Sequence, residues 1–435
     1  MKIFYNFLIL LVLFTACSFD NKTGIWKDAT KDELRVLLSK SQKTLFNKEI
    51  QNKDKIIKLE DEKKLTSWQF NNYTISNTIP NVTFSDSKII TKLSSRLSRS
   101  VKKDEIFFYK DNLISFDHKG TIFVFSTISN QKIFEYNFYK KNFKKKEKKL
   151  SIAIQKDTIF ISDNFGYLYS LDIKKKKIKW AKNFGIPFRS NIKIIDDILI
   201  LANQENILYG INVNNGDKIW ALATNFRLLK SKFINSIAIG DEDIYFLNTS
   251  GELYSINLIN NNINWVQNFS NKFSLGGSEI FISNSIIISE NNVIVTTNEG
   301  LHQLDSKSGN RNLSMSLVTE IQPLVTEKNI IIFTKNKFLI CIDRLSGEIV
   351  WSKNFIKQLI DVKKKFKIGK IDSIYAANNN LILISRNGYL LKLSFNSGEI
   401  LEIVKFLKKD LGSNPIFVNN KIFSLDAKKN LFEYR

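Results

Sequence analysis

The chain has 435 residues, of which 43% are hydrophobic and 25% are charged, so it can bury a large core and has the balance of a globular protein. Four prolines and 17 glycines exclude a collagen-like or Pro/Gly-rich chain, and two cysteines exclude a disulfide framework. The net charge of +23 fits an anionic partner, either a lipid headgroup surface or nucleic acid, but also plain lysine enrichment. We favour the enrichment, because Asn and Ile are abundant too and the lysine runs fall in expected turns.

The first 16 residues have the features of a targeting signal. Lys2 gives a positive start, and residues 4–14 are apolar except for Asn6. This run is too short to span a bilayer, which takes about 20 residues. It is therefore expected to direct export, and export argues against a nucleic-acid partner.

The sequence Leu-Phe-Thr-Ala-Cys at residues 13–17 resembles the bacterial lipobox. There, small residues precede a cysteine that is lipidated and becomes the new N-terminus. Phe14 departs from the usual aliphatic residue, and an ordinary secretory signal with a chance cysteine is the alternative. We predict a lipoprotein signal peptide at 1–16 and a lipid on Cys17. In the enterobacterial sorting pattern an Asp after the cysteine retains lipoproteins in the inner membrane, so Ser18 favours the outer membrane.

Residues 17–64 are expected to be a lipid-anchored tether. The part after residue 21 is rich in charge, with scattered Leu and Ile and no turn signals. Partial helix and plain disorder are both compatible with this composition.

An internal repeat then fills most of the chain. Each copy has an apolar strand that ends at Asp or Asn, a short turn that usually contains Gly, and a strand that often carries Trp. Trp180 and Trp220 are 40 residues apart, and Trp220 and Trp265 are 45 apart. Trp351 follows after two further periods, with a degenerate copy at 299–310 between them. A period of this length is typical of a β-propeller.

Each copy predicts one blade of four short antiparallel strands, which cannot bury both faces alone and must stack in a ring. Seven units lie between Lys103 and Phe406, and a three-stranded fragment follows. We therefore predict an all-β, eight-bladed propeller over 65–435, in which an N-terminal strand joins the C-terminal blade and removes its open edge. Residues 82–89 are our choice for this strand, and 64–70 are the alternative.

The pattern of Leu-Tyr, Asp or Asn, a Gly turn and Trp resembles the quinoprotein-type (PQQ-like) propeller repeat over about residues 100–435. With the lipobox, it is similar to the BamB family of outer-membrane assembly lipoproteins. The resemblance implies a non-catalytic scaffold without a cofactor on the periplasmic face of the outer membrane. Its implied partners are the central barrel/POTRA subunit of the assembly machine and unfolded barrel precursors.

The resemblance also indicates where a partner would bind. The family uses an interblade loop with a leucine-arginine pair, and residues 185–190 occupy a comparable place after Trp180. There, Arg189 would pair with a carboxylate and Phe188 would anchor in a pocket. The alternative without a binding role is that Arg189 is an ordinary cation of the loop and that Phe188 belongs to the core between blades. The family's second loop has paired aspartates, which residues 225–230 lack.

The main rival is a quinoprotein dehydrogenase, which uses the same repeat. Such a site needs bound calcium and usually two adjacent cysteines, whereas Cys17 and Cys341 are far apart in the sequence. Cys341 lies in an apolar run and is expected to pack as a small hydrophobe. His118 and His302 form no metal-spaced cluster, so we predict no catalytic or metal-binding residues. A propeller that binds another envelope component remains a third hypothesis.

Overall fold

The structure, a computed structural model, describes residues 46–435 apart from 54, 56, 58, 99–101, 140–142, 144, 229–231, 271–280 and 362–364. Residues 47–435 form one compact unit. The predicted signal peptide, Cys17 and most of the expected tether lie outside the described residues. None of the helices in the described part has the length and apolar character that a membrane span requires.

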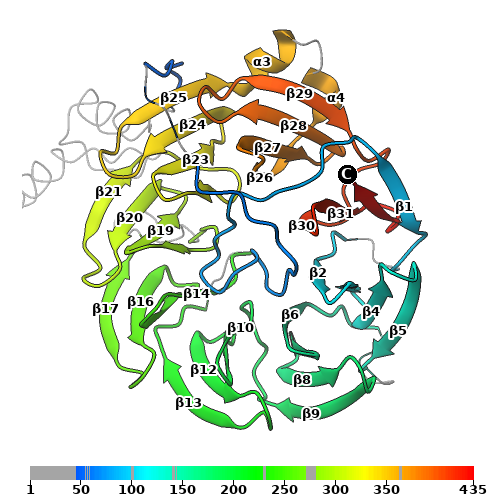
Figure 1. The fold of residues 1–435 in the computed structure, drawn as a ribbon. Coiled ribbons are helices and arrows are strands. Elements are labelled where there is room, and N and C mark those ends of the chain that lie inside the picture. Colours follow the sequence, from blue (N-terminus) through cyan, green and yellow to red (C-terminus); the bar gives the residue numbers. More distant parts are fainter. Residues whose placement is uncertain are drawn as a thin grey trace, which may run out of the picture. The chain divides into compact units, whose positions relative to one another are not determined.

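The described residues form eight four-stranded antiparallel sheets, arranged around an axis as the blades of a propeller (Figure 1). In blades 1 to 7 the four strands follow one another in sequence order. Blades 1 to 4 consist of β2 (Ile106–Tyr109), β3 (Asn112–Phe116), β4 (Thr121–Ser126) and β5 (Gln131–Asn137); β6 (Leu150–Gln155), β7 (Thr158–Asp163), β8 (Tyr167–Asp172) and β9 (Lys177–Asn183); β10 (Lys193–Ile195), β11 (Ile198–Ala202), β12 (Ile207–Asn212) and β13 (Lys218–Ala223); and β14 (Ser236–Ile239), β15 (Asp243–Leu247), β16 (Glu252–Asn257) and β17 (Ile263–Asn268).

The later blades repeat this plan, and short helices follow the last strand of blade 6. Blades 5 to 7 consist of β18 (Ile287–Ser289), β19 (Asn292–Thr296), β20 (Leu301–Asp305) and β21 (Arg311–Met315); β22 (Leu324–Val325), β23 (Asn329–Phe333), β24 (Phe338–Asp343) and β25 (Ile349–Asn354), then α3 (Phe355–Asp361) and α4 (Lys365–Ile368); and β26 (Ile371–Ala377), β27 (Asn380–Ser385), β28 (Tyr389–Ser394) and β29 (Ile400–Lys405). Blade 8 consists of β30 (Ile416–Val418), β31 (Lys421–Leu425), β32 (Leu431–Tyr434) and, from the N-terminal part of the chain, β1 (Ile90–Ser94).

The eight-bladed fold and its closure by an N-terminal strand are thus confirmed, but the choice of strand is wrong. β1 pairs antiparallel with β32, from Ile90 opposite Tyr434 to Ser94 opposite Leu431. Residues 82–89 and 64–70 both carry several apolar side chains. An outermost strand needs few of these, and the residues of β1 are exposed or half-buried. Val82 and Phe84 are instead buried in the core of the ring.

Residues 47–89, here called the strap, lie on the ring and cross its axis before they lead into β1 (Figure 1). The strap contacts the innermost strand, or the turn after it, in every blade through hydrogen bonds, which run in blade order as Trp68–Phe108, Gln69–Ile154, Thr74–Lys193, Ile75–Ile239, Ser76–Ile288, Glu60–Glu327, Val82–Ala376 and Leu65–Asn419. Residues 47–64, which we expected to belong to the tether, therefore pack with the propeller.

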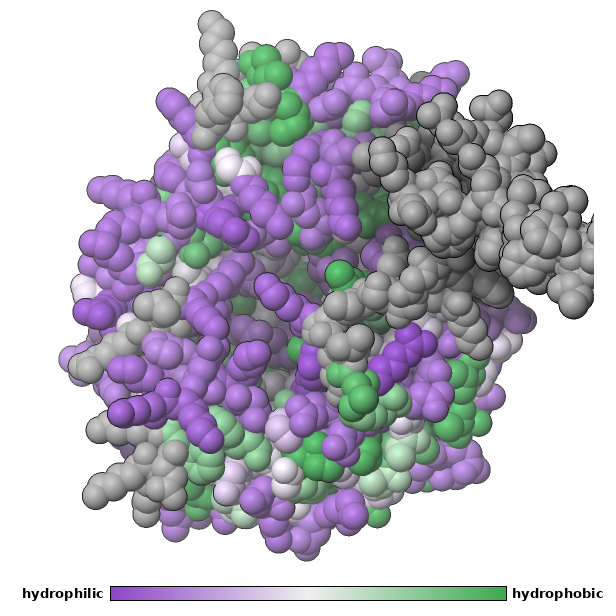
Figure 2. Space-filling view, turned by 180° about the vertical axis from the view of Figure 1, so that it is seen from behind, coloured by the Kyte–Doolittle hydropathy of each residue, from purple (hydrophilic) through white to green (hydrophobic). Residues whose placement is uncertain are grey.

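From Lys55 onward the strap lies at the end of the ring where the first strand of each blade turns into the second, and we call this the closed end. The opposite end is formed by the turns between second and third strands and by the loops that connect blades, and we call it the open end. Figure 2 looks at the molecule from the open end and shows a hollow near its centre.

The repeated Trp and Gly meet between neighbouring blades. The indole Nε1 of Trp180 donates to the Val213 carbonyl oxygen at 2.9 Å, in the turn of blade 3 that contains Gly216. A Cβ on Gly216 would lie 2.6 Å from the Trp180 ring, so the turn needs Gly both for its φ of +74° and for this approach. Trp265 with Gly309 and Trp351 with Gly398 repeat the contact.

Lys193 holds the strap from blade 3. Its fully buried Nζ lies 2.7 Å from the Thr74 carbonyl oxygen and 2.6 Å from Asn77 Oδ1. Burial lowers the pKa of Lys193 to about 7. A buried ammonium costs free energy, so this lysine is adapted to carry less charge than a surface lysine at neutral pH.

This burial predicts a pH dependence of stability. Between the folded pKa of about 7 and the ordinary lysine pKa of 10.5, the unfolded chain binds more protons at Lys193 than the folded chain does. Its contribution to the unfolding free energy should therefore increase with pH in this window, by at most about 1.4 kcal/mol per pH unit. Chemical denaturation at pH 7 and 9 should show a smaller rise for Lys193→Met than for the wild type. Lys218→Met, at an exposed position of the same blade, should not change the rise, and an equal effect of both variants would contradict the prediction.

Candidate binding site

A cleft of about 800 Å³ opens at the open end, near the axis and between the loops of blades 1 to 4. Its walls come from the ends of the inner strands and from the loops that connect the blades. Four basic residues line it, namely Lys102, Lys149, Arg189 and Lys232. The acidic residue among the lining is Glu105, and burial raises the pKa of its carboxyl group. The cleft is therefore electropositive and suited to an anionic or polar ligand.

Arg189 lies in the loop between β9 and β10, at the wall of this cleft. The loop is held by backbone hydrogen bonds from Arg189 N to the Ala202 carbonyl and from Asn235 N to the Arg189 carbonyl, both 2.9 Å. The guanidinium is half-buried, and its Nε and Nη2 donate to the Phe233 carbonyl oxygen at 3.3 and 3.0 Å. Arg189 thus ties the loop before blade 3 to the loop before blade 4.

Phe188, the other predicted contact residue, points into the protein. It is 7% exposed and packs edge-on against Phe184 and Tyr209, with ring centroids 5.4 and 6.3 Å apart. Phe188 belongs to the core between blades 2 and 3. The two neighbouring residues therefore have different surroundings, and the structure places only Arg189 at the protein surface.

Exposed apolar side chains from the next loops surround the same end of the ring, and the sequence reasoning did not single them out. Leu228 is 88% exposed, Ile282 is 55% exposed, Phe226 is 45% exposed and Ile234 is 42% exposed. Ile234 also lines the cleft. Figure 2 shows that hydrophobic and hydrophilic side chains are interspersed on this face. The available signal was the run at 225–230, which is apolar and basic and has no turn residues after Asn225.

The described residues contain no group of three or more His, Cys, Asp or Glu side chains placed to hold a metal ion. His302 Nδ1 lies 2.9 Å from Ser314 Oγ on the neighbouring strand. Cys341 is fully buried in blade 6, as expected for a small hydrophobe, and burial raises the pKa of its thiol. The feature of the open end that could bind a ligand is the basic cleft with exposed apolar side chains around it.

Comparison with known families matches residues 128–353 to the family described as outer membrane protein assembly factor BamB. This match covers more than half of the chain. The chain belongs to the BamB family. The BamB of Shewanella oneidensis is 20% identical over 343 residues, which cover 76% of this chain and 82% of the relative.

Solved structures agree with the fold. A crystal structure of BamB from Moraxella catarrhalis matches with a TM-score of 0.62 and 14% identity, over 80% of this chain and all of that one. A europium-containing methanol dehydrogenase matches with a TM-score of 0.61 and 10% identity, over 82% of this chain and 89% of the other. At such identities the likeness shows only the architecture, which BamB-family proteins and quinoprotein-type enzymes share.

Proposed function

We propose that the chain is a non-catalytic scaffold that supports the assembly of β-barrel proteins in the outer membrane. Membership of the BamB family is the observation that carries this proposal. The open end supports it, because exposed apolar side chains beside a basic cleft are features of surfaces that bind other proteins. The proposed partner is the central barrel/POTRA subunit, with unfolded barrel precursors as further clients.

The proposed location is the periplasmic face of the outer membrane, with a lipid on Cys17 as the anchor. The lipobox-like sequence before Cys17 and Ser18 after it support this location. Mass spectrometry of the N-terminal peptide from purified membranes would show the acyl groups. An unmodified Cys17 would leave the propeller assignment intact and remove the anchor.

Arg189 is the proposed contact residue, and Phe188 is proposed to act through the loop that it holds in place. Charge reversal in Arg189→Glu is expected to weaken capture of the barrel/POTRA subunit by roughly tenfold or more, because interface arginines often carry much of the binding energy. Affinity purification from detergent-solubilised envelope, with the partner quantified by mass spectrometry, is the measurement. Lys307→Glu, at an exposed turn of the closed end, is the matched control and should capture as the wild type does.

Arg189 also donates to the Phe233 carbonyl, so Arg189→Glu changes both the charge and this hydrogen bond. Arg189→Lys keeps the positive charge and alters only the hydrogen bond. A comparison of the two variants therefore separates the effect on local structure from the effect on binding. If Arg189→Glu keeps the wild-type melting temperature and the wild-type capture, Arg189 does not lie in the interface. Recovery of only unrelated envelope proteins by the wild type would reject the assembly role and favour a propeller with another envelope ligand.

The dehydrogenase alternative shares only the propeller architecture with this chain, as the europium-containing enzyme shows. That chemistry needs a quinone and a metal ion held near the propeller axis. In this chain the strap crosses the axis at the closed end, and the described residues provide no clustered set of three acidic or His/Cys ligands. The described residues therefore offer no group of acidic or His/Cys side chains that would favour such a site. Dye reduction with added quinone and calcium would overturn the scaffold proposal.

A further inference from the structure

Charge is divided unevenly between the two ends of the ring. At the closed end, the turns between first and second strands carry mainly carboxylates, among them Asp111, Asp157, Asp196, Asp197, Glu290 and Glu327. The turns between third and fourth strands at this end also carry basic residues, among them the run Lys174–Lys177, and Lys110 and Lys174 both pair with Asp157 at 3.1 and 2.8 Å. Lysine enrichment alone would affect both ends equally, so the difference between the ends needs another explanation.

The open end carries the excess of positive charge, and much of it lies over blades 6 to 8. Six exposed residues from five loops and turns form what we call the basic sector: Lys335, Lys370, Arg386, Lys408, Lys409 and Lys428. The carboxylates here are shared between cations. Glu320 pairs with both Lys337 and Lys370, and Asp372 pairs with both Lys103 and Arg386.

Besides Lys335, three lysines of the basic sector have no ion pair with any described residue. They are Lys408 and Lys409, in the loop after blade 7, and Lys428, in a turn of blade 8. The side chain of Lys428 lowers the pKa of Lys409, through a hydrogen bond to its amino group and through its positive charge. The exposed carboxylate nearest in sequence is Asp410, and the adjacent Asp426 is buried in its turn. The amino groups of Lys409 and Lys428 thus lie close together, with the carboxylates of Asp410 and Asp426 nearby.

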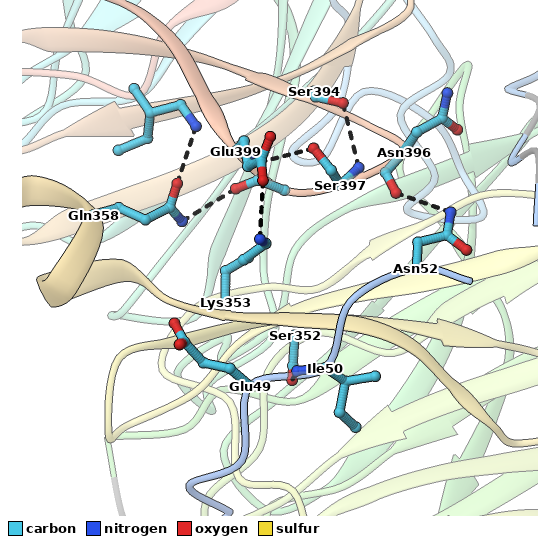
Figure 3. A network of polar contacts seen from close by, with 12 residues as sticks. Glu49, Ile50, Asn52, Ser352, Lys353, Gln358, Ser394, Asn396, Ser397 and Glu399 are labelled. Carbon is cyan, nitrogen blue, oxygen red and sulfur yellow. Dashed lines mark hydrogen bonds and ion pairs between the residues drawn. The ribbon is translucent and has the colours of Figure 1, made fainter. Parts of the chain in front are cut away.

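The strap reaches the ring from this same end. Glu49 Oε1 accepts from Asn354 N at 3.1 Å, at the open-end terminus of β25, and Lys357 Nζ pairs with Glu49 at 3.1 Å. The strap then runs along β25, where Ile50 lies beside Ser352 (Figure 3). It continues to the pair of Lys55 with Glu348 at the closed end. Glu49, near the start of the compact unit, therefore lies at the open end beside blade 6.

We propose that the basic sector binds the phosphate headgroups of an anionic lipid bilayer. Lysines predominate over arginine and are spread over three blades, so they suit a diffuse anionic surface better than bidentate recognition of one carboxylate. The Arg189 cleft lies over blades 1 to 4, so a bilayer and a protein partner occupy different sectors of the open end. The proposal does not depend on the partner of the cleft or on a lipid at Cys17.

The test is flotation of the full chain with vesicles, in a Cys17→Ser background so that no acyl chain contributes. Binding is expected to vesicles of equal parts phosphatidylglycerol and phosphatidylcholine, and not to phosphatidylcholine alone. In the variant Lys408→Glu, Lys409→Glu, Lys428→Glu, the partition coefficient should fall roughly a hundredfold, from about 1 kcal/mol for each lysine near the surface. Salt at about 1 M should release the wild type, because it screens charges beyond about 3 Å.

The matched control is Lys175→Glu, Lys177→Glu, Lys307→Glu, which changes three exposed lysines at the closed end by the same total charge. This variant should bind as the wild type does, and both variants should keep the wild-type melting temperature. Equal losses in both variants would show a dependence on net charge alone and overturn the proposal. Equal binding to both kinds of vesicle would overturn it too. Loss of partner capture by the open-end variant without any vesicle binding would assign the sector to an acidic protein instead.

Discussion

A variant that lacks residues 1–94 is expected to be largely unfolded at room temperature and to show no cooperative unfolding transition on heating. A variant that lacks only residues 1–46 is expected to retain this transition. The longer deletion removes β1, which supplies the outermost strand of blade 8 and leaves β32 with an unpaired edge. It also removes the strap, which contacts an inner strand or turn in every blade. The shorter deletion ends where the compact unit begins.

The size of the expected effect follows from the apolar side chains of the strap. Leu65, Trp68, Val82 and Phe84 are at most 5% exposed and belong to the core cluster shared by blades 1, 7 and 8. Burial of each such side chain contributes about 1.5–3 kcal/mol, so the four together approach the total stability of about 5–15 kcal/mol of many proteins. The strap is therefore a structural part of the ring.

The measurement is thermal unfolding followed by far-UV circular dichroism, with size-exclusion chromatography to detect aggregation through the open strand edge. The variant that lacks residues 1–46 is the internal control, since it keeps every described contact of the strap and the ring. If the variant without residues 1–94 melted at the same temperature as this control, blade 8 would be stable with three strands and the strap would contribute nothing measurable.

The fold could be predicted because its determinants are local and repeated. Trp180, Trp265 and Trp351 recur at the blade spacing, and each touches the Gly turn of the next blade. The regular spacing of Trp in the sequence therefore indicates a repeated Trp–Gly contact between neighbouring blades. The closing strand could not be identified in this way. Apolar residues mark burial, and the buried N-terminal residues belong to the strap, whereas the closing strand β1 is exposed or half-buried. Neither the path of the strap nor the ammonium of Lys193 inside the ring has a sequence signal.

The candidate site was predicted less completely, for a physical reason. Arg189 is a prediction from the family resemblance, which points to the loop after the Trp180 strand, and the structure places it at the cleft wall. Phe188 is adjacent in sequence but is buried, because which of two neighbours faces outward depends on the loop conformation. The exposed Leu228 and Ile282 come from loops without repeat signals. Their common location arises only when separate blades meet at the open end.

Truncation of Trp351 to alanine is expected to cost about 3–5 kcal/mol of unfolding free energy, which is the range for large buried aromatic residues. Trp351 is fully buried, and its Nε1 donates to the Phe395 carbonyl oxygen at 3.0 Å. Helix α3 covers it through Phe355 and Leu359. The helix is itself fixed to blade 7, because Gln358 Nε2 donates to the Gly398 carbonyl at 3.2 Å (Figure 3).

Trp265 provides the matched comparison, because it makes the same hydrogen bond, to the Ser306 carbonyl at 2.9 Å, but is only half-buried. Trp265→Ala should therefore cost clearly less than Trp351→Ala, since less apolar surface returns to water. Trp351→Phe should fall between the wild type and Trp351→Ala, because it keeps most of the ring and loses the donor. Urea unfolding curves give these free energies. Equal losses for the two alanine variants would show that the interblade hydrogen bond, rather than burial under α3, sets the contribution of this repeated residue.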